Sequence, residues 1–189
     1  MAMFDYVMVL AVIVVGLALT HLMQGVAHLV QHPERERIWW VHLAWVAQLF
    51  LMAVFWWWFE FRLRLIPVWT FQLYAFVLCY AFLIYLICAL LFPSDLSGYQ
   101  GYKDYFLSRR RWFFGLLIAV QGVDFFDTLA KGAAYFASLG IEYPVAQLGL
   151  ILLCVIGFLS PRERVQGAVV ILVSGYQIAR VLRFYDVVR

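Results

Sequence analysis

The chain has 189 residues, of which 66% are hydrophobic and 13% are charged, with a formal net charge of +3. Soluble proteins are roughly 45–50% apolar and about 25% charged, so this composition excludes a water-soluble fold. At about 20 apolar residues per crossing, the length accommodates six or seven spanning helices and no soluble domain. The sequence therefore predicts an all-α polytopic membrane bundle that forms a single domain over residues 1–189.

Apolar runs bounded by charged residues, proline or glycine predict six spanning helices joined by short hairpins. They cover residues 4–31, 38–61, 68–92, 112–140, 144–160 and 165–188. The first run begins with Asp5 and has no small-x-small cleavage site after it, so it is expected to remain as a helix. Trp40 and Trp57 lie about 26 Å apart along the second helix, which is close to the thickness of the hydrocarbon layer.

Loop charges predict the orientation of these helices. The basic residues in the loops on one side outnumber those on the other by eight to four. The positive-inside rule makes the richer side cytoplasmic, so both termini are expected on the outer, periplasmic side of a bacterial inner membrane. The richer side has Arg35, Arg37, Lys103, Arg109, Arg110, Arg111, Arg162 and Arg164, and the other has Arg62, Arg64, Arg183 and Arg189.

The longest loop, residues 93–111, predicts an interfacial segment. Tyr99, Tyr102 and Tyr105 are spaced three apart, and Arg109, Arg110 and Arg111 follow them. On a helix this pattern places aromatic rings along one face and basic groups at the membrane, which suits an anionic leaflet. Lipid headgroups are therefore the expected ligands of the three arginines. The alternative is a solvated loop whose charges only set the topology.

The fourth predicted helix carries a polar stripe at helical spacing. Its acids are expected to have partners because ionisable groups at bilayer depth are costly. Asp124 comes out about 18 Å from the cytoplasmic end, near mid-bilayer, and Arg180 comes out level with Asp127 as its expected partner. Asp127 and Lys131 are spaced as an i,i+4 ion pair. The stripe consists of Gln121, Asp124, Asp127 and Lys131.

A second stripe, His21, Gln24, His28 and Gln31, follows the first helix. By depth, His21 is level with Gln48 and Gln121, and the three form one polar layer if their helices are neighbours. A line of proton-capable groups then runs from His28 and His21 to Asp124, to Asp127, and on to Lys131 or Glu60. The alternative for each histidine is a hydrogen-bonded packing residue.

Cofactor and catalytic motifs are weak or missing. No cofactor is expected, and the alternative is haem or a divalent metal bound by His28 and His42, which are level on antiparallel helices. Since the sequence has no GxSxG motif, P-loop or CxxCH, no catalytic residues are assigned and an enzyme is not favoured. The basic residues cluster at helix ends, which gives no support to nucleic-acid binding.

These features favour proton-linked transport or ion conduction through an intramembrane polar cluster. The alternatives are a structural or accessory subunit of a larger membrane complex, with the charges holding helices together, and a haem- or metal-binding redox protein. The expected partners are the lipid bilayer and either a second copy of the chain or another membrane subunit. Nucleic acid is not an expected partner.

Overall fold

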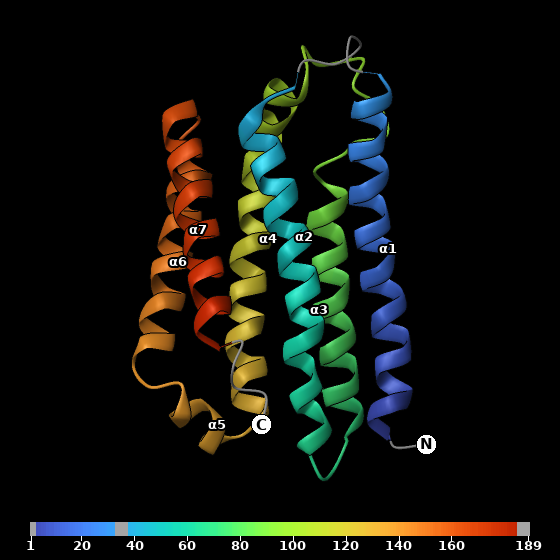
Figure 1. The fold of residues 1–189 in the computed structure, drawn as a ribbon, viewed down its shortest axis with the longest axis vertical. Coiled ribbons are helices and arrows are strands. Elements are labelled where there is room, and N and C mark those ends of the chain that lie inside the picture. The colour runs from blue at the N-terminus through green and yellow to red at the C-terminus, as the bar shows by residue number, and fades with distance from the viewer. Residues whose placement is uncertain (1–2, 33–37, 185–189) are drawn as a thin grey trace.

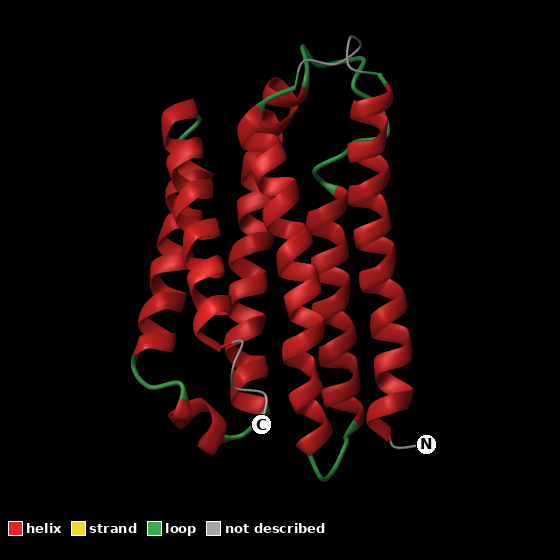
Figure 2. Cartoon of the chain, in the orientation of Figure 1, coloured by secondary structure: helices red, strands yellow, loops and turns green. Residues whose placement is uncertain are grey.

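The computed structural model describes residues 3–32 and 38–184, and all regular structure in these residues is helical (Figure 2). The predicted helix end at residues 185–188 and the loop arginines Arg35, Arg37 and Arg189 lie outside them. Six of the described helices are long and apolar enough to cross a membrane, which confirms the predicted all-α membrane bundle.

The helices follow one another as antiparallel neighbours (Figure 1). The six long ones are α1 (Met3–Gln31), α2 (Trp40–Glu60), α3 (Phe71–Ala89), α4 (Tyr102–Ala130), α6 (Glu142–Leu159) and α7 (Glu163–Phe184). The 3₁₀ helix η1 (Phe61–Leu65) extends α2, and a short helix α5 (Ala133–Ser138) links α4 to α6. We refer to the end of the bundle that contains η1 and α5 as the α5 end.

Packing divides the bundle into two sides that meet at α2 and α4. On one side α1 packs against α3 and α2, and on the other α6 packs against α4 and α7. Figure 1 shows α1 at one edge of the bundle and the α6–α7 hairpin at the opposite edge. Contacts between α3 and α4 and between α2 and α7 join the two sides. The first helix is therefore remote from the last two.

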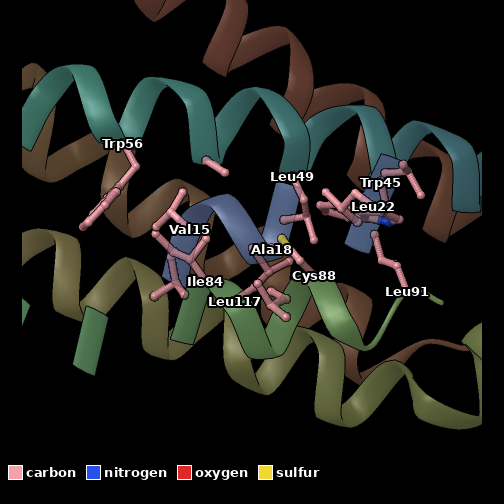
Figure 3. Close-up of a cluster of buried hydrophobic side chains, with 14 of the residues drawn as sticks. Val15, Ala18, Leu22, Trp45, Leu49, Trp56, Ile84, Cys88, Leu91 and Leu117 are labelled. Atoms are coloured by element: carbon pink, nitrogen blue, oxygen red, sulfur yellow. The ribbon is translucent and has the colours of Figure 1, made fainter. Parts of the chain in front are cut away.

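The core is formed by side chains that α1, α2, α3 and α4 direct towards one another (Figure 3). Trp45 is fully buried and packs edge-on against Phe113 and Phe114, with ring centroids 5.0 Å and 5.6 Å away. Such edge-to-face pairs are favoured by the ring quadrupole. Small residues such as Ala18 of α1 let helices approach closely, as is typical of membrane bundles.

The fourth spanning helix begins ten residues before the predicted start. Residues 102–111, which are most of the predicted interfacial loop, are therefore the first part of α4. Gly101, with φ of 135°, makes the sharp entry into α4 that a residue with a side chain rarely adopts. Tyr102 and Tyr105 are buried, and the Tyr105 hydroxyl donates to the Leu90 carbonyl at 2.9 Å. These rings therefore face protein and not lipid, which spacing alone did not distinguish.

The remaining loop before α4 is held by Asp95. Its carboxylate accepts hydrogen bonds from the Ser97 backbone N–H at 2.8 Å and from the Ser97 hydroxyl at 2.9 Å. These bonds hold the pKa of the Asp95 carboxyl below its ordinary value, and the backbone bond has the larger effect. The turn is of the kind that aspartate makes with its own backbone two residues on.

Helix α4 ends at Ala130, although the apolar run predicted a helix to residue 140. Gly132 has φ of 115° and Gly140 has φ of 63°, and both conformations favour glycine. The chain therefore leaves α4 at Gly132, forms α5, and turns again at Gly140 into α6. Hydropathy does not reveal these two helix breaks, because a glycine residue does not interrupt an apolar run.

We expect Gly157→Ala in α6 to lower the free energy of unfolding by about 1–3 kcal/mol through overpacking. A Cβ at this position would lie 2.4 Å from the ring of Phe114 in α4. The control is Gly149→Ala on the same helix, where a Cβ meets no atom within 4 Å and alanine adds up to about 1 kcal/mol of helix propensity. Unfolding in mixed detergent measures both variants, and equal effects would contradict the close α4–α6 contact.

Candidate functional site

A cavity of about 100 Å³ lies among α2, α4, α6 and α7, with Tyr80 of α3 in its wall. A water molecule needs roughly 10–15 Å³ on this measure, so several fit. Most of the wall is apolar, and its polar groups include Gln48, Gln121, Asp124 and Arg180. The structure thus brings together four of the residues that the sequence marked, from three different helices.

Asp124 and Glu60 are the acids in the wall of this cavity, and the hydrogen bonds of Asp124 come from neutral groups. Its Oδ1 accepts from the Tyr80 hydroxyl at 3.2 Å. Its Oδ2 accepts from the Tyr143 hydroxyl at 2.9 Å and from the Gln147 amide at 2.5 Å. Within residues 3–32 and 38–184 it forms no ion pair. Three donors therefore stabilise the carboxylate without cancelling its charge.

The donors are oriented by further hydrogen bonds between α4 and α6. Tyr143 and Gln147 are one helical turn apart on α6 and face α4. The Gln121 amide donates to the Gln147 side-chain oxygen at 3.1 Å, which directs the Gln147 amide nitrogen to Asp124. The Thr128 hydroxyl lies 2.9 Å from the Tyr143 hydroxyl. If Tyr143 donates its single proton to the carboxylate, Thr128 is the donor in that contact.

A second polar contact crosses the opposite wall of the cavity. Gln48 of α2 donates a hydrogen bond to the side-chain oxygen of Gln177 of α7. Gln48 is buried, and both residues line the cavity. An amide pair at bilayer depth satisfies groups that lipid leaves without partners, so it fixes the facing surfaces of these two helices.

The ion-paired acids lie at the α5 end of α2 and α4. Lys131 Nζ lies 3.0 Å from Glu60 Oε1 and also pairs with the Asp127 carboxylate, so the predicted i,i+4 contact is present. The side chains of Glu60 and Asp127 are 1% exposed and that of Lys131 is 5% exposed. Two carboxylates thus share one ammonium group in a site closed to solvent.

The predicted pairing of Arg180 with Asp127 is wrong. The Arg180 guanidinium lies over the Phe59 ring at 5.2 Å and over the Tyr143 ring at 5.6 Å. Depth along a helix gives the level of a residue but not its direction around the axis, and α7 packs against α2 and α6. Lys131 reaches Asp127 from the next turn of the same helix, so Asp127 is paired without α7.

The stripe on α1 is not part of this cavity. The His21 ring donates from Nε2 to the Phe92 carbonyl at 3.1 Å. His21, Gln24 and His28 line a separate cavity at the end opposite α5. The predicted polar layer of His21, Gln48 and Gln121 is therefore absent, because α1 packs against α3 and α2 and not against α4.

The two histidines of the alternative cofactor site have other neighbours in the structure. His42 is buried, donates from Nε2 to the Leu91 carbonyl at 2.7 Å, and stacks on Tyr102. The ring of His28 stacks on His32 with centroids 4.9 Å apart. The part of the chain that the structure describes contains no group of three or more potential metal ligands. Haem or metal binding at these residues stays a prediction.

The three consecutive arginines of α4 point in different directions. Arg109 donates to the Tyr99 hydroxyl at 3.0 Å, and Arg110 donates to the Leu107 carbonyl at 2.8 Å. Arg109 and Arg111 are exposed, and Arg110 is partly buried. Headgroup binding by these residues stays a prediction.

Sequence reasoning missed the partners of Asp124 and of Gln48. Tyr80, Tyr143, Gln147 and Gln177 carry no formal charge, and tyrosine near a helix end is typical of a lipid interface. One signal was present, because Gln147 interrupts an apolar run and lies four residues after Tyr143. A polar residue at that spacing in a spanning helix indicates a buried face.

These observations define the class of this chain, which is a multi-pass membrane protein with a cavity among its helices whose mainly apolar wall contains several polar side chains. Comparisons with protein-family models, with curated proteins and with solved structures find no match. The function is therefore argued from the site alone.

Proposed function

We propose that this protein carries out proton-linked transport of a small solute or ion, with Asp124 as the proton acceptor. The observation that carries this proposal is the set of neutral donors, Tyr80, Tyr143 and Gln147, on an acid that lines a cavity. An acid paired one to one with a lysine or arginine would keep its charge. Asp124 becomes neutral when it binds a proton, so proton binding changes the charge of the cavity.

A second cavity supports a route from Asp124 towards the α5 end. It is lined by Glu142 and Arg183, an exposed ion pair, and it shares Tyr176 and Arg180 with the Asp124 cavity. The Arg180 and Tyr176 side chains therefore lie between the two cavities. Movement of these side chains would open the Asp124 cavity to the α5 end.

We propose that the α5 end faces outward, the periplasm of a bacterial inner membrane. Support comes from the loop charges, since the sequence assigns eight basic residues to the predicted loops on the other side of the membrane and four to this side. In this orientation the Asp124 cavity exchanges protons with the outside through the cavity beside Arg183.

The test of this function is proton movement across liposomes that contain the purified protein. We expect acidification of the lumen under an inward proton gradient, well above the rate in protein-free liposomes. The control variant is Glu163→Gln, which removes an exposed acid that lines neither cavity and is expected to keep flux. Absence of flux in wild-type protein, with any gradient, would contradict the proposal.

A groove between α1 and α2 favours a second candidate, an accessory subunit or homo-oligomer. It is lined by Phe4, Met8, Trp57, Trp58 and Phe61 among others and is almost entirely apolar. Trp57 and Trp58 are exposed, and aromatic faces of this kind meet either lipid or another helix. A stoichiometric partner that co-purifies from native membranes and is lost with Trp58→Ala would support this candidate.

A further inference from the structure

The charged groups around the cavity are unequal in number. Glu60, Asp124 and Asp127 are acidic, and the bases that face them are Lys131 and Arg180. The cluster therefore carries one excess negative charge when all five groups are ionised. Bilayer depth and the low exposure of the Lys131 site leave little water to screen this charge.

The hydrogen bonds show where the excess negative charge lies. Both Asp124 side-chain oxygens accept bonds, the Tyr80 hydroxyl from α3 being one of the donors. Glu60 and Asp127 each offer one oxygen to Lys131. Their second oxygens, Glu60 Oε2 and Asp127 Oδ1, are buried and have no hydrogen-bond partner among the described residues. Buried polar atoms of this kind are rare in native proteins and need an explanation.

We propose that Glu60 and Asp127 together hold one proton at neutral pH, on an oxygen that Lys131 does not bind. The pair then has a single negative charge, which Lys131 neutralises, and the remaining charges are those of Asp124 and Arg180, which line the same cavity. Two carboxyl groups in one site commonly share a proton because their like charges repel. The site is thus a proton-binding site distinct from Asp124, with almost fully buried carboxyl groups, and Glu60 also lines the Asp124 cavity.

The proton position rests on charge and burial alone, and only its transfer to Asp124 rests on the proposed function. Asp127 and Asp124 are one turn apart on α4. In the transfer step the O–H bond of the pair breaks, the proton binds the Asp124 carboxylate, and the pair becomes fully ionised. A second proton from the α5 end restores the pair.

Infrared spectroscopy of the reconstituted protein tests this proposal. We expect the carbonyl band of a protonated carboxylic acid at neutral pH, shifted in heavy water. Isotope labelling of the glutamate or aspartate carboxyl carbons should move the band in wild-type protein, so the assignment does not require a variant to fold. Glu60→Gln or Asp127→Asn is expected to remove the band, and Glu142→Gln, a change in an exposed acid, is expected to keep it.

Two outcomes would overturn the proposal. In the first, wild-type protein shows no protonated carboxyl band at neutral pH. In the second, the band is present but is lost in Asp124→Asn and retained in Glu60→Gln and Asp127→Asn. A band that persists in a protein without proton flux would instead support the proton site and contradict the transport function.

Discussion

Replacement of Lys131 by methionine is expected to lower the free energy of unfolding by about 3–5 kcal/mol. Lys131 is the only cation that pairs with Glu60 and Asp127 in the described residues, and all three side chains are buried. Methionine has a similar length but no charge, so this substitution leaves the buried carboxylates without a compensating positive charge. The expected loss is therefore far larger than that of one hydrogen bond.

The matched control for this effect is Lys103→Met. Lys103 pairs with Glu163 at 2.5 Å, and both side chains are about half exposed, at 47% and 54%. Exposed pairs contribute about 0–1 kcal/mol, so this variant should unfold nearly as wild type does. Unfolding in mixed detergent micelles measures both variants. Lys131→Met combined with Asp127→Asn is expected to recover part of the loss, and equal stability of the two lysine variants would contradict the buried site.

Features that depend on neighbouring residues in the chain were predictable from the sequence. Six apolar runs predicted the six spanning helices, because each run must satisfy its own backbone hydrogen bonds in lipid. The contact of Asp127 with Lys131 followed from i,i+4 spacing. The helix start at Gly101 was not predicted, because the residues that follow it include Lys103, Asp104 and three arginines, as a loop would. The helix end at Gly132 was not predicted, because apolar residues continue on both sides of it.

Features that depend on the order of helices in the bundle were not predictable. Depth placed Arg180 beside Asp127 and His21 beside Gln121, and both pairings are wrong, because level says nothing about which helices touch. Glu60 ends α2, a position that suggested the membrane surface, but its side chain is buried and pairs with Lys131. Side-chain partners across helices require the rotation of each helix, which composition does not contain.

Asp124→Asn is expected to reduce proton flux in liposomes by at least about a hundredfold, the low end for removal of a proton-transferring group. Asparagine has nearly the same size as aspartate but does not take up a proton. It also offers one side-chain acceptor in place of two, where Tyr80, Tyr143 and Gln147 present donors. A stability loss of about 1–3 kcal/mol is therefore expected in addition, which leaves the fold intact for the flux measurement.

The control on the same helix is Asp104→Asn, because Asp104 is an exposed acid in the first turn of α4. It should keep wild-type flux, which shows that loss of a negative charge from α4 is not itself the cause. Flux that survives in folded Asp124→Asn would remove Asp124 from the pathway. Protein without flux in any form, but destabilised by Asp124→Asn, would make the network of Tyr80, Tyr143 and Gln147 a structural link between α3, α4 and α6. The helix interface, and the groove beside Trp58, would then be the place to look for a partner.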